Sequence, residues 1–121
     1  MERIIIGTFK GDYMVSDDNR SFPVPHNYAS KSKLVVGDRL KLFITEEGDF
    51  IYKQIEPIQR KKILAEYIGF DTIRHKEKLY SILHNSVTYY RLKEGDKVSA
   101  YIPQDIESSW AAVDLLIPSD Y

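Results

Sequence analysis

The sequence predicts an all-β protein made of two small barrels in tandem, and three observations lead to this prediction. Tyrosine occurs nine times and phenylalanine five times in 121 residues, and aromatic residues suit pleated, half-buried strands. Apolar residues alternate over short stretches, and no long segment has the periodicity of an amphipathic helix. The two halves of the chain also match each other at one constant offset.

The offset is 58 residues, and it aligns the halves without a gap. Conservative pairs accompany the identical ones in this single register, which indicates an internal duplication. We therefore predict one barrel module over residues 1–59 and a second over residues 60–121. The identical pairs are Ile5/Ile63, Gly11/Gly69, His26/His84, Asn27/Asn85, Leu34/Leu92, Gly37/Gly95, Asp38/Asp96 and Ile44/Ile102.

The first unit is expected to contain five strands separated by residues that favour turns. Pro23 lacks an amide hydrogen, which confines the third strand to an edge or places the proline at a strand end. The longer connection Asn27–Val36 is expected to hold one helical turn, and the Gly37-Asp38 turn starts the fourth strand. The expected strands are Ile4–Phe9, Tyr13–Val15, Ser21–Val24, Arg39–Thr45 and Phe50–Ile55.

The second unit repeats this pattern after a joint at Glu56–Lys61. Its expected strands are Lys62–Tyr67, Thr72–Arg74, Leu79–Leu83, Lys97–Ile102 and Trp110–Leu115. Five short strands with a longer link before the fourth are typical of OB-like or SH3-like barrels. The alternative is one barrel in which the halves interleave about a pseudo-twofold axis, as in double-psi or cradle-loop barrels. Five strands in each half favour two tandem modules.

Composition excludes several classes of protein. Seventeen Lys and Arg against 18 Asp and Glu give a formal charge of −1, which argues against coating nucleic acid by charge alone. The absence of cysteine excludes disulfides, thiolate zinc sites and a cysteine nucleophile. The start of the chain lacks the apolar core of a signal peptide, and no apolar run approaches the ~20 residues of a membrane span. We therefore expect a soluble, cytoplasmic protein.

Four segments of the first unit follow a recognisable order. An apolar strand with glycine (Ile6–Phe9) is followed by an aromatic second strand (Tyr13–Asp18). A third strand then ends in Val-Pro (Phe22–Pro25), and a Leu-x-x-Gly-Asp sequence starts the fourth strand (Leu34–Leu40). This unit resembles an OB module of the cold-shock or S1 type. The tandem arrangement looks most like the paired cold-shock-like domains of RNase II-class exoribonucleases. No catalytic acidic cluster accompanies it, so the resemblance implies a binding module.

Aromatic and basic residues indicate how such a module would bind. Single strands are bound by aromatic platforms beside a basic groove. Between Arg20 and Lys41 there are five Lys and Arg against one acidic residue, and between Arg60 and Lys78 there are six against three. We expect a non-catalytic RNA-binding adaptor. Its candidate residues are Phe9, Lys10, Tyr13, Tyr28, Lys31, Lys33, Arg60, Lys61, Lys62, Tyr67, Arg74, Tyr89, Tyr90 and Arg91.

Other interpretations stay open at this point. Phe9 and Tyr67 also suit a barrel core. His26 and His84 are secondary binding candidates, but each His-Asn pair also suits a strand end at which the asparagine makes a turn or cap.

Function is equally open, because RNA, DNA and a protein partner all remain candidates. The alternative function is a protein-interaction module that docks on a larger assembly. In that case the Trp110–Ile117 segment is either the docking element or the last strand. No phosphate-binding glycine loop, nucleophile elbow or His-Glu-x-x-His motif is present, so we expect neither an enzyme nor a bound metal or cofactor.

Overall fold

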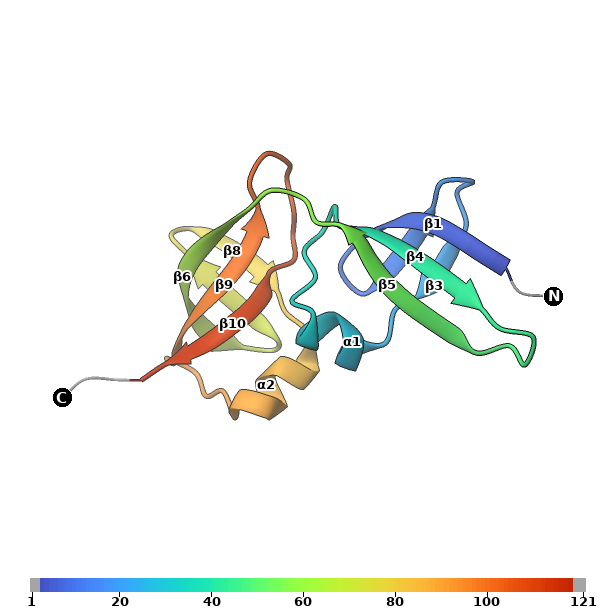
Figure 1. The fold of residues 1–121 in the computed structure, drawn as a ribbon. Helices are drawn as coiled ribbons and strands as arrows, with labels where there is room; N and C mark the ends of the chain where they lie inside the picture. The colour runs from blue at the N-terminus through green and yellow to red at the C-terminus, as the bar shows by residue number, and fades with distance from the viewer. Residues whose placement is uncertain (1–2, 119–121) are drawn as a thin grey trace.

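The computed structural model describes residues 3–118. These residues form an all-β fold with two five-stranded antiparallel sheets, one from each half of the chain (Figure 1). The predicted fold class of two tandem five-stranded units is therefore confirmed. The interleaved alternative is wrong, because every strand pairs inside the sheet of its own half.

The first sheet has the strand order β3-β2-β1-β4-β5, and a short helix connects β3 to β4. Its expected strands are all present, and their ends differ from the predicted ones by one residue at most. The elements are β1 (Arg3–Phe9), β2 (Tyr13–Ser16), β3 (Ser21–Pro23), α1 (His26–Lys31), β4 (Arg39–Ile44) and β5 (Phe50–Glu56).

The second sheet repeats this arrangement, in the order β10-β9-β6-β7-β8. Four of its strands occupy the places that the 58-residue offset assigns to them, whereas β10 begins four residues later than the offset from β5 would place it. The second helix again precedes the fourth strand. The elements are β6 (Arg60–Gly69), β7 (Thr72–His75), β8 (Lys78–Ser81), α2 (His84–Tyr90), β9 (Lys97–Pro103) and β10 (Ala112–Ile117).

The Gly-Asp turns have the structural role that the sequence predicts. The carboxylate of Asp38 accepts a hydrogen bond from the amide of Val35 at 2.8 Å, and that of Asp96 accepts one from the amide of Lys93 at 2.8 Å. A carboxylate that bonds a nearby amide in this way fixes the turn. The same local chemistry therefore starts β4 and β9.

The two short helices correct the expectation for the His-Asn pairs. His26 and His84 are the first residues of α1 and α2, and the N-cap positions belong to Pro25 and Leu83. Neither helix has a side-chain cap. Asn27 and Asn85 therefore do not act as caps, because each lies inside its helix, beyond the capping position.

The sheet edges are joined differently in the two units. In the second unit Ser81 donates its amide to Ser109 at 2.7 Å and accepts the amide of Ala111 at 3.0 Å, next to a parallel bridge with Trp110. Pro23 is the equivalent of Ser81 in the first unit and has no amide hydrogen to donate. There the hydroxyl of Tyr52 donates to the carbonyl oxygen of Pro23 instead.

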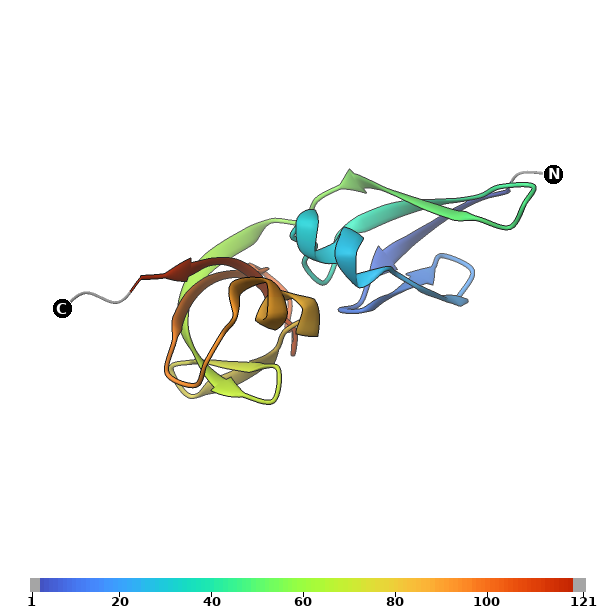
Figure 2. The ribbon, with the colours of Figure 1, turned by 90° about the horizontal axis from the view of Figure 1, so that it is seen from below.

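The units meet along α1, α2 and the segment that leads into β10 (Figure 2). The indole of Trp110 lies against Gly11 of the first unit. Leu83 packs against the core of the first unit. Asn85 donates its amide to the hydroxyl of Ser30 at 2.9 Å. Apolar and polar contacts thus join the two halves directly, in addition to the short connection between β5 and β6.

Candidate nucleic-acid interface

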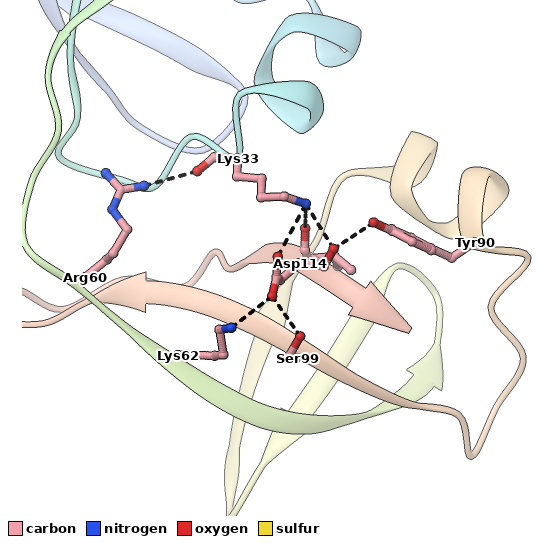
Figure 3. Close-up of polar contacts among 7 residues, drawn as sticks. Lys33, Arg60, Lys62, Tyr90, Ser99 and Asp114 are labelled. Carbon is pink, nitrogen blue, oxygen red and sulfur yellow. Dashed lines mark hydrogen bonds and ion pairs between the residues drawn. The ribbon is translucent and has the colours of Figure 1, made fainter. Parts of the chain in front are cut away.

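Asp114 organises the junction between the units (Figure 3). The pairing of β10 with β9 passes from Val113 to Leu115 and skips Asp114, which is a β-bulge. The side chain of Asp114 accepts a hydrogen bond from Ser99 at 3.1 Å and pairs with Lys62 at 3.3 Å. A bulge redirects a side chain, and here it places a carboxylate at the edge of the neighbouring unit.

Lys33 of the first unit reaches this carboxylate across the junction. Its ammonium donates to the carbonyl oxygen of Asp114 at 2.9 Å and lies 3.6 Å from the carboxylate. The hydroxyl of Tyr90, at the end of α2, donates to the same carbonyl oxygen at 2.7 Å. Lys33 and Tyr90 therefore have structural partners, and both are held at one side of the space between the helices.

The electrostatics of Asp114 follow from these contacts. Burial alone would raise its pKa, since a charged group loses hydration in the interior. Hydrogen bonds from Lys62 and Ser99 and the charges of Lys62 and Lys33 outweigh burial, so the pKa of Asp114 lies below its ordinary value. The carboxylate is therefore ionised at neutral pH, and the junction contains an ion-pair network.

A second carboxylate fixes the connection between the units. The side chain of Asp38 is completely buried and pairs with the guanidinium of Arg60. It also accepts the amide of Ile58 at 2.9 Å and the side-chain amide of Gln54 at 3.0 Å. Arg60 donates to the carbonyl oxygen of Lys33 at 3.1 Å. Arg60 thus joins β6 to the first unit and is engaged within the protein.

A groove of about 430 Å³ lies between α1 and α2. Both units contribute to it, and its lining combines basic, amide, hydroxyl and aromatic groups. The lining residues are Asn27, Ser30, Lys31, Lys33, Asn85, Ser86, Thr88, Tyr89, Tyr90 and Val113. Four predicted site residues, two from each unit, therefore share one groove.

The two tyrosines of the groove differ in exposure. Tyr89 is 79% exposed, whereas Tyr90 is half-buried and packs against the core of the second unit. Their rings meet edge to face, with centroids 4.9 Å apart and an angle of 88°. The edge-to-face contact therefore holds Tyr89 against Tyr90 while most of the Tyr89 side chain stays exposed to a ligand.

Several predicted residues lie elsewhere. Phe9 and Tyr67 are 2% and 7% exposed core residues, so the prediction that they stack on bases is wrong, because a buried ring has no accessible face. Tyr28 is half-buried and stacks on Tyr52, with centroids 6.1 Å apart. Burial raises the pKa of both tyrosines, that of Tyr52 to about 12.

The remaining candidates are exposed but lie outside the groove lining. Lys62 pairs with Asp114, and Arg74 pairs with Glu66 at 3.2 Å. His84 contacts the carboxylate of Asp71 at 2.9 Å. The other exposed candidates are Lys10, Tyr13, His26, Lys61 and Arg91.

Sequence reasoning missed the polar groups that complete the junction. Asn85 lines the groove, and its side-chain oxygen is buried without a hydrogen-bond partner. Its identity with Asn27 is a signal in the sequence, but such an identity is also expected of a residue that makes a turn or a cap. Asp114 is the single acidic residue in the apolar segment Ala111–Ile117. Such an isolated charge in a predicted strand indicates a buried, paired group.

No protein-family model, curated protein or solved structure matches the chain. Within residues 3–118, neither helix has the length and apolar character needed to span a bilayer. The same part of the chain contains no group of three or more His, Cys, Asp or Glu side chains placed to hold a metal ion.

Proposed function

We propose that the protein is a non-catalytic module that binds unpaired nucleic acid, RNA in particular, in the groove between α1 and α2. The observation that supports this is that Lys31 from one unit and the exposed Tyr89 from the other line the same groove. An aromatic platform beside a cation is the arrangement that binds single strands. The resemblance of the first unit to cold-shock and S1-type modules agrees with it.

The groove residues have distinct roles in this proposal. One base stacks on Tyr89, and Lys31, which has no partner in the described part of the chain, contacts a phosphate. Asn27 offers an amide donor and acceptor from the exposed side of α1. Lys33 and Tyr90 maintain the shape of the groove, because both are bound to Asp114.

Binding affinity tests the role of Tyr89. A stacked base is worth about 1–3 kcal/mol, so we expect Tyr89→Ala to weaken the binding of a short RNA by about 5- to 150-fold. Tyr89→Phe should bind as the wild type does. Tyr13→Ala, which removes an exposed aromatic outside the groove lining, is the matched control and should change nothing. Fluorescence anisotropy with labelled RNA and DNA oligonucleotides at low salt measures these affinities.

The salt dependence gives a second readout. The phosphate contact of Lys31 should give a slope of log K against log salt of about −0.7, the value for one phosphate contact of a single strand. A much steeper slope would locate the binding on a larger basic surface. The proposal fails if no oligonucleotide binds at low salt, or if Tyr89→Ala binds as well as the wild type.

The second candidate function is docking on another protein. Leu64 and Leu115 are 67% and 54% exposed on the outer face of the second sheet, on either side of Ser99. Exposed apolar side chains that lie close together are typical of protein contacts. A stoichiometric complex that survives nuclease treatment and is lost in Leu64→Asp would favour this function.

A further inference from the structure

The turn between β6 and β7 presents a bulky aromatic residue in a strained conformation. Phe70 is 96% exposed, and both Phe70 and Asp71 have positive φ, 52° and 53°. Turns with two positive φ values favour glycine and asparagine, and a large side chain there is costly. The fold gains no buried surface from Phe70. A strained and exposed aromatic ring indicates a role in binding.

The turn is also held rigidly. Thr72 donates its hydroxyl to the carbonyl oxygen of Phe70 at 2.8 Å. Ile82 donates its amide to the carbonyl oxygen of Asp71 at 2.9 Å, and the carboxylate of Asp71 contacts His84 at 2.9 Å. The ring is therefore presented by an ordered backbone, which lowers the entropic cost of binding.

Two acidic residues are close to Phe70 in the turn. Asp71 follows it directly in the chain, and the side chain of Glu94 lies over Gly69, the residue before it. These acidic neighbours disfavour a phosphate at this place. They favour an apolar pocket with a basic rim.

The outer face of the second sheet has such a pocket. It is a groove of about 470 Å³ lined by Leu64, Ala65, Glu66, Arg74, Lys76, Lys97 and Ile117. Leu64 and Ile117 are 67% and 37% exposed and provide apolar surface. Glu66 is the one carboxylate of the lining, and it pairs with both Arg74 and Lys97. With Lys76, the groove lining has three cations against this one carboxylate. Lys76 has no partner within residues 3–118.

We propose that Phe70 of one copy of the protein enters this groove on a second copy. In a two-fold dimer both Phe70 rings are buried at once, and each copy contributes the same surface. Asp71 and Glu94 then lie near the basic rim that includes Lys76. The proposal does not depend on nucleic-acid binding, because it uses another surface of the second unit.

Sedimentation equilibrium of the full chain tests the proposal. The wild type should self-associate in the range of weak dimers, at micromolar to sub-millimolar concentration. Phe70→Ala should weaken the association at least tenfold. Phe70→Asn should weaken it as strongly and raise the melting temperature, because asparagine suits the turn. Tyr13→Ala, an exposed aromatic of the first unit, is the matched control and should associate like the wild type.

Charge reversal tests the complementarity of the two surfaces. Glu94→Lys and Lys76→Glu should each weaken the dimer, and the double variant should recover much of the loss, as coupled positions do. The proposal is overturned if the wild type is a monomer up to about 1 mM, or if Phe70→Ala associates normally. A monomer whose RNA binding is weakened by Phe70→Ala would assign Phe70 to nucleic acid instead.

Discussion

The two units have the same strand order, but their equivalent glycines meet different neighbours. Gly11 in the first unit is covered by the indole of Trp110 from the second unit. Gly69 in the second unit is covered by the side chain of Glu94 from its own unit. One surface thus receives a neighbouring domain, whereas its counterpart is closed by a flexible, charged side chain.

Residues near these glycines differ between the units in the same way, because they are apolar in the first unit and charged in the second. Val35 and Val36 line the space at the junction, and their equivalents in the second unit are Lys93 and Glu94. In repeat proteins an apolar face is kept where a neighbour covers it, and a polar face is placed where the array ends. The comparison shows how a duplicated sequence produces an asymmetric pair without altering its sheets.

The Gly-Asp turns show the same divergence. Asp38 and Asp96 make the same turn hydrogen bond, but only Asp38 also binds Arg60, Ile58 and Gln54. Asp38 is fully buried, whereas Asp96 is half-buried. The first turn became the attachment point of the connection between the units, and the second remained a turn.

Substitution of these aspartates should produce the largest difference between the units. Asp38→Asn leaves the guanidinium of Arg60 without its carboxylate, and loss of one partner of a buried ion pair costs about 3–5 kcal/mol. Asp96→Asn should cost about 1 kcal/mol, the usual value of one hydrogen bond. The midpoint of urea unfolding measures both. Equal losses would show that Asp38 has no role beyond its turn.

Alanine at the two glycines should give a smaller difference. A Cβ atom added to Gly11 would lie 2.5 Å from the Trp110 ring, whereas one added to Gly69 would meet only the side chain of Glu94 at 2.8 Å. Both residues have positive φ, so alanine strains each backbone by about 1–3 kcal/mol. Gly11→Ala should cost about 1–3 kcal/mol more, because the indole must move. Similar melting temperatures would contradict this.

The smallest expected effect is the pH dependence of the junction. The pKa of Asp114 is lower in the folded protein than its ordinary value of 3.8. Its contribution to stability is therefore complete above that value and is lost as the pH falls through the folded pKa. Asp114→Asn should be less stable than the wild type at neutral pH, and the gap should narrow between about pH 5 and pH 2. A stability difference between the wild type and Asp114→Asn that stays constant with pH would contradict the lowered pKa of Asp114.

The strands and turns were predictable because they depend on local patterns. Alternating apolar residues located every strand, and the duplication assigned each strand of one unit to its counterpart in the other. Helix α2 was less accessible, because the seven residues from His84 to Tyr90 lack the length at which a helical period becomes visible. For the connection before the fourth strand, the sequence predicts a single helical turn.

The site was only partly predictable, because it depends on contacts between distant residues. Of the predicted tyrosines of α2 and lysines near α1, Tyr89 and Lys31 are exposed. Tyr90 and Lys33 are half-buried and bound to Asp114. Phe9 and Tyr67 have the same residue types as binding aromatics, and only the packing of the sheets shows that they are buried. The pairing of Lys33 with Asp114 joins positions 81 residues apart, which no local pattern encodes.

Trp110 also makes the junction observable by spectroscopy. It is the single tryptophan of the chain, and its indole lies on Gly11 across the boundary between the units. Its fluorescence therefore reports on whether the two halves are docked, without any label. A red shift of the emission before the loss of β-sheet circular dichroism would show that the halves separate while each remains folded.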